Sequence, residues 1–373
     1  MIFKALVWPV ALSLVLLFTA SSVEGQKRRI VLSTKKALVT ARMDPIVSPN
    51  GISQHSHHIV GGNNFNTVYD PAKLRASTCS NLGVHADLSA YWQPQLFQRL
   101  TNGTYIAMWS NTRIYYEQPQ TKTGVKVEPF PENFGMIAGD AGRKTLNPTD
   151  QGQILQSYYC EIQNADGSIK SSKETHSMPT EPCDIIVTKS WFPTCWNGKP
   201  YDRANPKAHV AYPNFGGGFL GANCPAGFDR RFISIHMETY YWRNKNVPKP
   251  ASGQPQFILA NGDTTGYGLH ADFTNGWDTK VLTDMINNCK TVPVEEPADQ
   301  ACAALKPSFN RAKGDSCMYL NVIPDEPVGY SHAMNYLPGC NLPWSSGTKP
   351  TCTPKQFKGD PAWIQPAAGT TWP

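Results

Sequence analysis

Short apolar runs separated by turn-forming residues make up most of the chain. β-Branched and aromatic residues within these runs predict strands at 29–32, 104–109, 113–116, 184–188, 231–242 and 256–260. The polar stretch Ser110, Asn111 and Thr112 lies between two of the runs and predicts a hairpin turn. Asn261-Gly262 predicts another turn after the last strand. Because 31 Pro and 29 Gly are spread throughout the chain, long helices are not expected.

Helical periodicity is confined to two short segments. Asp278 suits the N-cap of a helix at 279–288, and Pro297 suits the start of a second helix at 297–305. Many short strands with few helices predict a mainly β fold with a sandwich or jelly-roll-like core. The C-terminal part of the chain has poor hydrophobic periodicity. We therefore predict that it is irregular and held together by disulfides.

The N-terminal segment has the order of a secretory signal: a positive start at Lys4, an apolar run at 5–20, and small residues up to Gly25. The apolar run is shorter than the roughly twenty residues that a membrane span needs. We therefore predict a signal peptide at 1–25, a lead-in at 26–42, a β-rich domain at 43–289 and a Cys/Pro-rich covering segment at 290–373. A retained membrane anchor is the alternative. The expected location is secreted, either extracellular or in the cell wall.

The cysteine count agrees with export. An even number of cysteines in an oxidising compartment predicts five disulfides and no free thiol. The pairing is left open, although Cys289 and Cys302 are close enough in sequence to join the two predicted helices. The ten residues are Cys79, Cys160, Cys183, Cys195, Cys224, Cys289, Cys302, Cys317, Cys340 and Cys352.

The net charge and its distribution limit the classes of binding partner that the sequence predicts. The net charge of +6 is mild for 373 residues and its basic residues are scattered, so no nucleic-acid partner and no stable membrane span are predicted. Weak attraction to anionic wall or matrix polymers is all that this charge supports. The sequon Asn102-Gly103-Thr104 lies between two apolar runs and predicts a glycosylated turn. The oligomeric state is left open.

Three short patterns place ionisable residues two positions apart, so that in a strand each pair faces one side. Imidazole and carboxylate groups side by side serve both acid–base chemistry and metal binding. No cofactor is predicted, and a metal ion held by these residues is the alternative. A histidine that is simply solvated or hydrogen-bonded is the plain structural interpretation of any one pair. The pairs are His55/His57, His236/Glu238 and His270/Asp272.

Aromatic residues often stand beside Gly, Asn or Asp, as in Tyr91-Trp92, Trp196-Asn197 and Trp277-Asp278. An aromatic face next to amide and carboxylate groups suits a sugar ring, which stacks and accepts hydrogen bonds. Core packing is the alternative explanation for most of these tryptophans.

Five motifs in order resemble a secreted fungal family known only as a domain of unknown function, which is sometimes fused to WSC carbohydrate-binding modules. The motifs are MDPIVSPNGISQHSHHIVGGNNF (43–65), SAYWQPQLF (89–97), FPTCWNGKP (192–200), HVAYPNF (209–215) and GDTTGYGLHADFTNGWD (262–278). The sequence departs from the family pattern at Asn197, where an Asp is expected. The family implies no activity. The residues carried over from it are Asp44, His55, His57, Trp92, Cys195, Trp196, His209, Cys224, His270, Asp272, Asn275, Gly276, Trp277 and Asp278.

These patterns together predict a protein that acts on cell-wall or matrix polysaccharide as a hydrolase or lyase. The rival hypothesis is a non-catalytic glycan-binding protein with structural histidines. We expect His55, His57, His270 and Asp272 to line one cleft, with Trp277 on its wall. The catalytic candidates are His55, His57, Glu238, His270 and Asp272. The substrate-binding candidates are Trp92, Trp196, His209, Asn275, Trp277 and Asp278.

Overall fold

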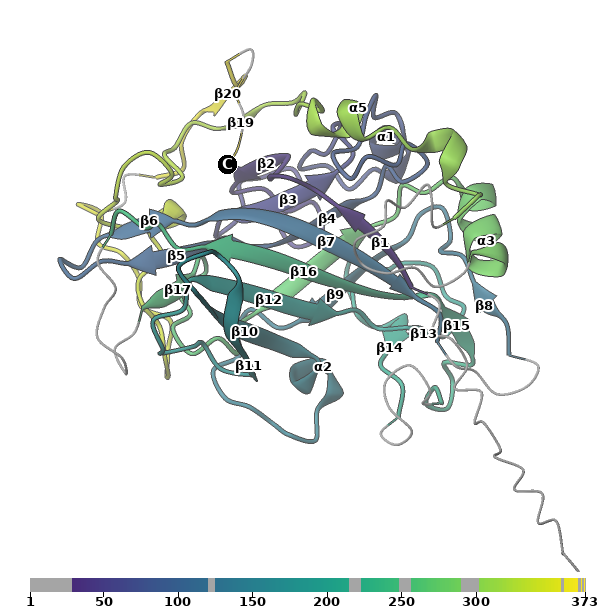
Figure 1. Cartoon of the computed structure of the whole chain (residues 1–373), viewed down its shortest axis with the longest axis horizontal. Helices are drawn as coiled ribbons and strands as arrows, with labels where there is room; N and C mark the ends of the chain where they lie inside the picture. The colour runs from purple at the N-terminus through teal and green to yellow at the C-terminus, as the bar shows by residue number, and fades with distance from the viewer. Residues whose placement is uncertain are drawn as a thin grey trace, which may run out of the picture.

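Two antiparallel sheets lie face to face and form the body of the molecule (Figure 1). The structure is a computed structural model that describes residues 29–119, 125–214, 223–247, 256–289, 302–356 and 359–367, with 370 and 372. The fold is mainly β, as the sequence predicts. The predicted signal peptide and most of the predicted helix at 297–305 lie outside the described residues.

The first sheet has six strands in the order β1-β7-β16-β12-β10-β11, and each neighbouring pair is antiparallel. Strands far apart in sequence are therefore neighbours in this sheet. Its strands are β1 (Arg29–Ser33), β7 (Trp109–Glu117), β16 (Ser234–Trp242), β12 (Ile185–Trp191), β10 (Gln156–Gln163) and β11 (Ile169–Thr175).

The second sheet has five antiparallel strands in the order β2-β3-β4-β18-β9. Nearly every residue in these strands is buried, because the sheet is covered on both faces. Its strands are β2 (Val39–Ala41), β3 (His57–Gly61), β4 (Ala90–Pro94), β18 (His270–Thr274) and β9 (Gly135–Gly139).

Three smaller sheets flank the sandwich. One has the order β14 (Val210–Ala211), β13 (Cys195–Trp196), β15 (Arg230–Phe232) and β8 (Val127–Glu128). The second has the order β17 (Phe257–Leu259), β5 (Leu96–Arg99) and β6 (Tyr105–Ala107). The third pairs β19 (Ile323–Pro324) with β20 (Trp363–Ile364).

Helices are few and short in the described part of the chain. The longest is α3, which spans the 279–288 segment predicted from sequence and is capped by the Asp278 carboxylate, as expected. The others are α1 (Pro71–Arg75), α2 (Gln151–Ile154), α5 (Arg311–Asp315), and the single turns η1 (Lys306–Ser308) and η2 (Pro338–Cys340).

Alternate residues of the two large sheets form the central core. Ile114 and Met237 of the six-stranded sheet pack in one cluster with Tyr91 and Phe273 of the five-stranded sheet. Full burial of each such side chain contributes about 1.5–3 kcal/mol to folding. A second cluster covers the opposite face of the five-stranded sheet, where the segment after β2 and the C-terminal segment supply the covering residues. The five-stranded sheet therefore forms the middle layer of the molecule.

The predicted hairpin turn at 110–112 is wrong, because these residues lie inside the continuous strand β7. Ser110 and Thr112 are buried and face the other sheet, where their hydroxyl groups contact the two ring nitrogens of His58 at 2.9 and 2.8 Å. Hydroxyl groups that find partners across the sandwich behave as core residues. The predicted strand at 231–242 is divided at Ile233 into β15 and β16.

Five disulfides use all ten cysteines: Cys79–Cys317, Cys160–Cys183, Cys195–Cys224, Cys289–Cys302 and Cys340–Cys352. No free cysteine remains. The predicted count and the suggested Cys289–Cys302 bond are confirmed. Among the described residues, no helix is long and apolar enough to cross a membrane.

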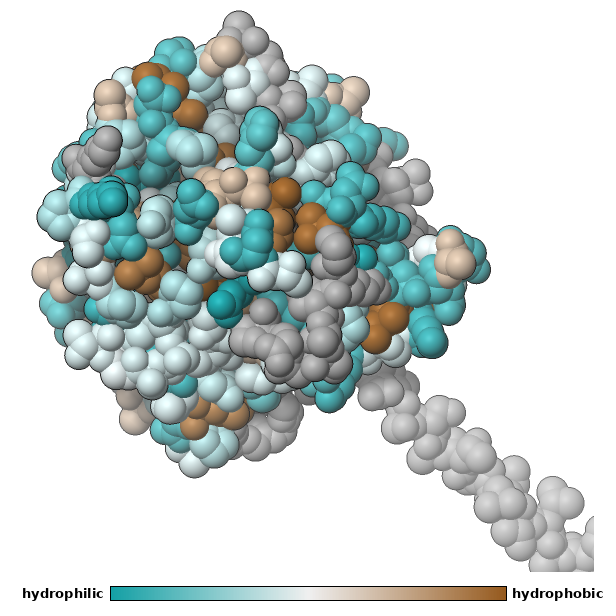
Figure 2. All heavy atoms as spheres, turned by 90° about the vertical axis from the view of Figure 1, so that its left-hand side faces the viewer, coloured by the Kyte–Doolittle hydropathy of each residue, from teal (hydrophilic) through white to brown (hydrophobic). Residues whose placement is uncertain are grey.

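The chain after residue 302 follows the upper and left rim of the molecule in Figure 1. It has little regular structure and is held by side chains, since the buried Arg42 guanidinium contacts the carboxylates of Glu326 and Asp360 at 2.5 and 2.9 Å. Figure 2 shows hydrophobic residues on this side only in small separate groups. Asn102 lies in the exposed turn between β5 and β6, and its glycosylation stays a prediction.

We expect the Cys79–Cys317 bond to stabilise the attachment of the C-terminal segment more than the other disulfides do, because it spans 238 residues of sequence. A Cys79→Ala/Cys317→Ala variant should lose about 2–5 kcal/mol of unfolding free energy. Urea unfolding followed by tryptophan fluorescence measures this. The matched control is Cys340→Ala/Cys352→Ala, which opens a span of only 12 residues and should lose less. An equal or larger loss in the control would contradict the prediction.

Candidate metal centre

The strand register of the five-stranded sheet brings the sequence-predicted pairs together. Asp272 on β18 and Ile59 on β3 both pair with Trp92 on the intervening β4, and His57 pairs with Pro94 of β4. His57 lies two residues before Ile59, and His270 lies two residues before Asp272. Both histidines therefore sit on the outer face of the sheet, on either side of β4. Their ring centroids are 5.9 Å apart.

His55 reaches the same place from the segment before β3. Its ring centroid lies 4.4 Å from that of His57 and 5.1 Å from that of His270. The Nε2 atoms of His55 and His270 are 3.1 Å apart. Two nitrogen ligands of one tetrahedral zinc ion would be about 3.3 Å apart, given the usual zinc–nitrogen bond length. The three imidazoles thus have the separation that a shared ion requires.

Backbone carbonyl groups fix the orientation of two of these rings. His57 Nδ1 lies 3.0 Å from Met43 O, and His270 Nδ1 lies 2.9 Å from Gly268 O. A carbonyl oxygen only accepts hydrogen bonds, so each Nδ1 carries the proton and each Nε2 carries a lone pair. Metal-binding histidines are commonly held by such a bond from the second ring nitrogen.

Two carboxylates complete the cluster. One oxygen of Asp44 accepts the N–H groups of Ile46 and Val47 at 2.9 and 3.0 Å, which holds the side chain in place. Neither oxygen of Asp272 has a hydrogen-bond partner among the described residues, although Asp272 is 0% exposed. One ligand atom each from Asp44, His57 and Asp272 lie within 4.8 Å of one another, and the same holds for His55, His57 and His270.

Burial sets the protonation of the cluster. It lowers the pKa of His57 to about 3, against the effect of the Met43 carbonyl, so its imidazole is neutral. Burial, with the neighbouring His57, also lowers the pKa of His270 to about 4. It raises the pKa of Asp272, which the nearby Asp44 raises further. The neutral imidazoles therefore supply no positive charge to the Asp272 carboxyl group, which has no hydrogen-bond partner among the described residues.

Tyr201 lies beside the two carboxylates of the cluster and stacks on Tyr69. Tyr69 and Tyr201 stack with their ring centroids 4.5 Å apart. Both hydroxyl groups are buried and lack a hydrogen-bond partner among the described residues, as does His57 Nε2. Burial and the nearby Asp272 and Asp44 carboxylates raise the pKa of Tyr201. Several buried polar atoms thus lie in this region without hydrogen bonds to one another. Their burial lowers the stability of the fold unless a further group binds there.

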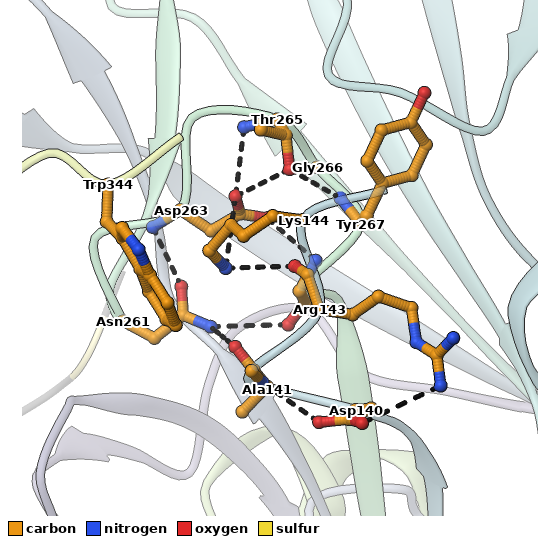
Figure 3. Close-up of polar contacts among 12 residues, drawn as sticks. Asp140, Ala141, Arg143, Lys144, Asn261, Asp263, Thr265, Gly266, Tyr267 and Trp344 are labelled. Atoms are coloured by element: carbon orange, nitrogen blue, oxygen red, sulfur yellow. Dashed lines mark hydrogen bonds and ion pairs between the residues drawn. The ribbon is translucent and has the colours of Figure 1, made fainter. Parts of the chain in front are cut away.

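Figure 3 shows a polar network around Asp263. This network supports the His270 side of the cluster through Gly268. Asp263 accepts the backbone N–H of Gly268 at 2.7 Å, and the Asn261 amide donates to the Gly268 carbonyl at 3.3 Å. Lys144 Nζ lies 3.4 Å from Asp263 and 3.9 Å from the ring centroid of Trp344. Gly268, whose carbonyl accepts the hydrogen bond from His270 Nδ1, is therefore held through both its N–H and its carbonyl group.

Other predicted site residues lie elsewhere. Trp277 is not on the wall of the cluster: it is in the central core, where its indole donates to the Tyr116 hydroxyl. Glu238 lies on the outer face of the six-stranded sheet, beyond the core. Trp196 packs on Phe232, and its indole donates to the Lys199 carbonyl.

The remaining candidates have structural contacts in this fold. Asn275 donates to the Pro131 carbonyl and accepts the Trp277 N–H, which shapes the turn before α3. Asp278 caps α3. His209 Nε2 lies 2.8 Å from Gly135 O, and its ring contacts Tyr201 edge-on, so it borders the cluster without facing it. Trp92 is buried on the outer face of β4 beside the cluster.

Sequence reasoning missed three contributors. Tyr69 and Tyr201 carry no local motif, and only their stacking and the position of Tyr201 beside the carboxylates mark them. Asp44 belongs to the first family motif but was not chosen as a site residue. An Asp side chain in a turn often accepts the backbone N–H of the residue two positions later. Asp44 does so, because its carboxylate accepts the N–H of Ile46.

The fold and the cluster define a disulfide-bonded β-sandwich protein with an enclosed site of three histidines and two carboxylates. The model of a domain of unknown function, DUF1996, matches residues 44–277, and the chain belongs to this family. The resemblance inferred from the motifs is confirmed at that level. No curated protein and no solved structure matches the chain.

We expect Asp272→Asn to stabilise the metal-free protein at neutral pH by about 1–3 kcal/mol. Burial raises the pKa of the Asp272 carboxyl group, which destabilises the fold above the unfolded-state pKa, and a neutral amide removes this cost. Urea unfolding in chelator-containing buffer measures the change. Asp263→Asn is the matched control, because Asp263 is equally buried but accepts several hydrogen bonds. The control variant should be destabilised. Loss of stability in Asp272→Asn comparable to that of the control would contradict the prediction.

Proposed function

We propose that this protein binds one divalent transition-metal ion at the cluster and acts with it on extracellular polysaccharide. One observation carries the metal assignment. The Nε2 lone pairs of His57 and His270 converge beside Asp272, whose two buried oxygens have no partner among the described residues. A cation placed there would satisfy all of these atoms at once.

The donor set indicates the class of metal. Imidazole nitrogen with carboxylate oxygen is typical of zinc and its neighbours, whereas calcium and magnesium prefer sites built from oxygen alone. His55, His57 and His270 are the proposed nitrogen ligands and Asp272 the proposed oxygen ligand. Asp44 is less available, because one of its oxygens is already occupied by two backbone N–H groups. The carbonyls of Met43 and Gly268 orient the rings.

A substrate pocket adjoins the His55 side of the cluster. It has a volume of about 400 Å³ and is lined by the polar side chains of Ser53, Gln54, Asn341 and Lys349, together with Arg42 and Asp360. His55 follows Gln54 in the chain and is the most exposed of the proposed ligands, at 9%. A polar pocket of this kind suits the hydroxyl groups of a sugar chain. A bound metal would supply a Lewis acid and an activated water molecule for hydrolysis.

Secretion is part of the proposal. Five disulfides support an oxidising environment, and the charged start, apolar run and small residues at 1–25 support export. The fungal cell wall or extracellular matrix is the setting in which such a protein would meet polysaccharide.

The burial of the proposed ligands favours a second candidate function. None of the five residues is more than 9% exposed. Structural metal sites are closed by protein ligands, whereas catalytic sites keep an open position. A metal fully enclosed here would support a non-catalytic glycan-binding protein in which the histidines stabilise the fold.

Metal analysis tests the assignment. Protein purified without a histidine tag and dialysed against zinc should retain about one ion per chain, as measured by mass spectrometry. His57→Ala and His270→Ala should each lose most of it. His58→Gln is the matched control, since His58 is the next residue but faces the core, where it contacts Ser110 and Thr112. Metal retained in both cluster variants, or lost equally in the control, would rule out the site.

Activity then separates the two functions. Zinc-loaded and chelator-treated protein should be incubated with neutral and acidic wall polysaccharides, and new reducing ends or unsaturated products measured. The proposed enzyme predicts products only from the loaded form. Metal that raises the melting temperature while no polysaccharide is cut would favour the glycan-binding candidate.

A further inference from the structure

Aromatic side chains gather on the outer face of the six-stranded sheet, the opposite side of the sandwich from the metal centre. Alternation along β7 and β16 places Ile114 and Met237 in the core, so their sequence neighbours point outward. Trp109 on β7 pairs directly with Trp242 at the end of β16. We call this surface the aromatic face, and it comprises Trp109, Tyr159, Trp191, Tyr240 and Trp242.

The aromatic face is open at one end and closed at the other. Trp109 is 60% exposed, more than any other aromatic residue among those described. Tyr240 and Trp242 lie side by side with ring centroids 6.3 Å apart and planes 29° apart. At the closed end, the His236 ring lies between Tyr115 and Trp191, at 4.2 and 4.1 Å. In Figure 1 the described helices lie at the ends and edges of this sheet.

Charged groups on this face are paired with one another or with the rings. Lys189 lies 3.8 Å from Glu174 and 5.3 Å from the Tyr159 ring centroid. Arg113 lies 4.7 Å from the Tyr240 ring centroid, and the Tyr240 hydroxyl donates to Glu238 at 3.1 Å. Cations and carboxylates alternate across the strands, so the surface offers no field of one sign. An uncharged partner complements such a surface better than an acidic or basic one.

The chemistry of the face also distinguishes a sugar from a protein partner. A protein interface core excludes charges, whereas here carboxylate, ammonium and guanidinium groups stand between the rings. Burial alone would raise the pKa of Glu238, but His236, Tyr115 and Tyr240 together lower it to about 2, so its carboxylate accepts hydrogen bonds at neutral pH. Rings that stack on sugar C–H groups, with acceptors and donors beside them for hydroxyls, are the complement of a polysaccharide.

We propose that the aromatic face binds an uncharged polysaccharide chain, with Trp109, Tyr240 and Trp242 as the stacking residues. Binding there involves none of the proposed metal ligands, which lie beyond the core on the outer face of the five-stranded sheet. The aromatic face would hold the protein on an insoluble wall polymer, and the metal centre would be free to act or to serve structure. Polymer binding at the aromatic face is therefore independent of metal binding at the cluster.

Polymer binding tests this proposal. The wild-type protein is mixed with insoluble β-1,3-glucan, cellulose and chitin, and the free protein is measured after centrifugation. Polygalacturonate-containing gels provide the acidic comparison. We expect binding to at least one neutral polymer, weakened about tenfold or more in Trp109→Ala/Trp242→Ala, because the stacking rings are lost. Trp109→Ala alone should weaken it by a smaller factor. That single variant removes a mostly exposed side chain, so it checks the effect independently of folding.

Two control variants complete the design. Trp363→Ala removes another exposed tryptophan, on β20 of the C-terminal segment, and should bind as the wild type does. Ile169→Ala alters an exposed side chain on β11 of the same sheet, outside the aromatic face, and should also bind normally. The proposal is overturned if no neutral polymer is bound, if only the acidic polymer is bound, or if Trp109→Ala and the double variant bind like the wild type. Concentration-dependent dimerisation abolished by Trp109→Ala would likewise replace it with a contact between copies.

Discussion

The alternation of side chains along the middle sheet is the constraint on which the rest of the molecule depends. His57 and His58 are neighbours in sequence, yet His58 bonds to hydroxyl groups between the two large sheets while His57 faces outward into the histidine and carboxylate cluster. A shift of register by one residue would exchange these environments. The same alternation along β18 sends Phe273 to the central core and Asp272 to the cluster. Core and site are therefore two faces of the same strands, and each fixes the register of the other.

Burying the cluster has an energetic consequence. The covering segments remove water from the Asp272 carboxyl group, the His57 Nε2 atom and the two tyrosine hydroxyl groups. None of these atoms has a hydrogen-bond partner among the described residues. Each such group costs about 1–3 kcal/mol. A stable fold therefore has to offset this cost through its cores and disulfides, or through a bound cation. The Asp263 carboxylate and the backbone of Gly268, by contrast, have hydrogen-bond partners.

The sequence predicted the features that depend on local chemistry. The Asp278 cap, the helix it begins and the turn at Asn261-Gly262 follow from neighbouring residues, and the structure contains them. The two-residue spacing in His55/His57 and His270/Asp272 showed that each pair could face one side. What local patterns could not show was which strands are neighbours. His236/Glu238 has the same spacing but belongs to the other sheet, and Ser110 with Thr112 resembles a turn until His58 is seen opposite.

The outer faces of the two large sheets can bind different kinds of ligand. Loops and the C-terminal segment enclose one surface, which makes it dry enough to hold ionisable groups in unusual protonation states. The outer face of the six-stranded sheet keeps aromatic and charged side chains at regular strand spacing, where a long and repetitive ligand could lie across several strands. An enclosed polar centre selects for a small, highly charged ligand, because only such a ligand compensates buried carboxylates. An extended aromatic surface selects for an uncharged polymer. Since the hydrophobic core separates the two, we expect a substitution on one face to leave the geometry of the other intact.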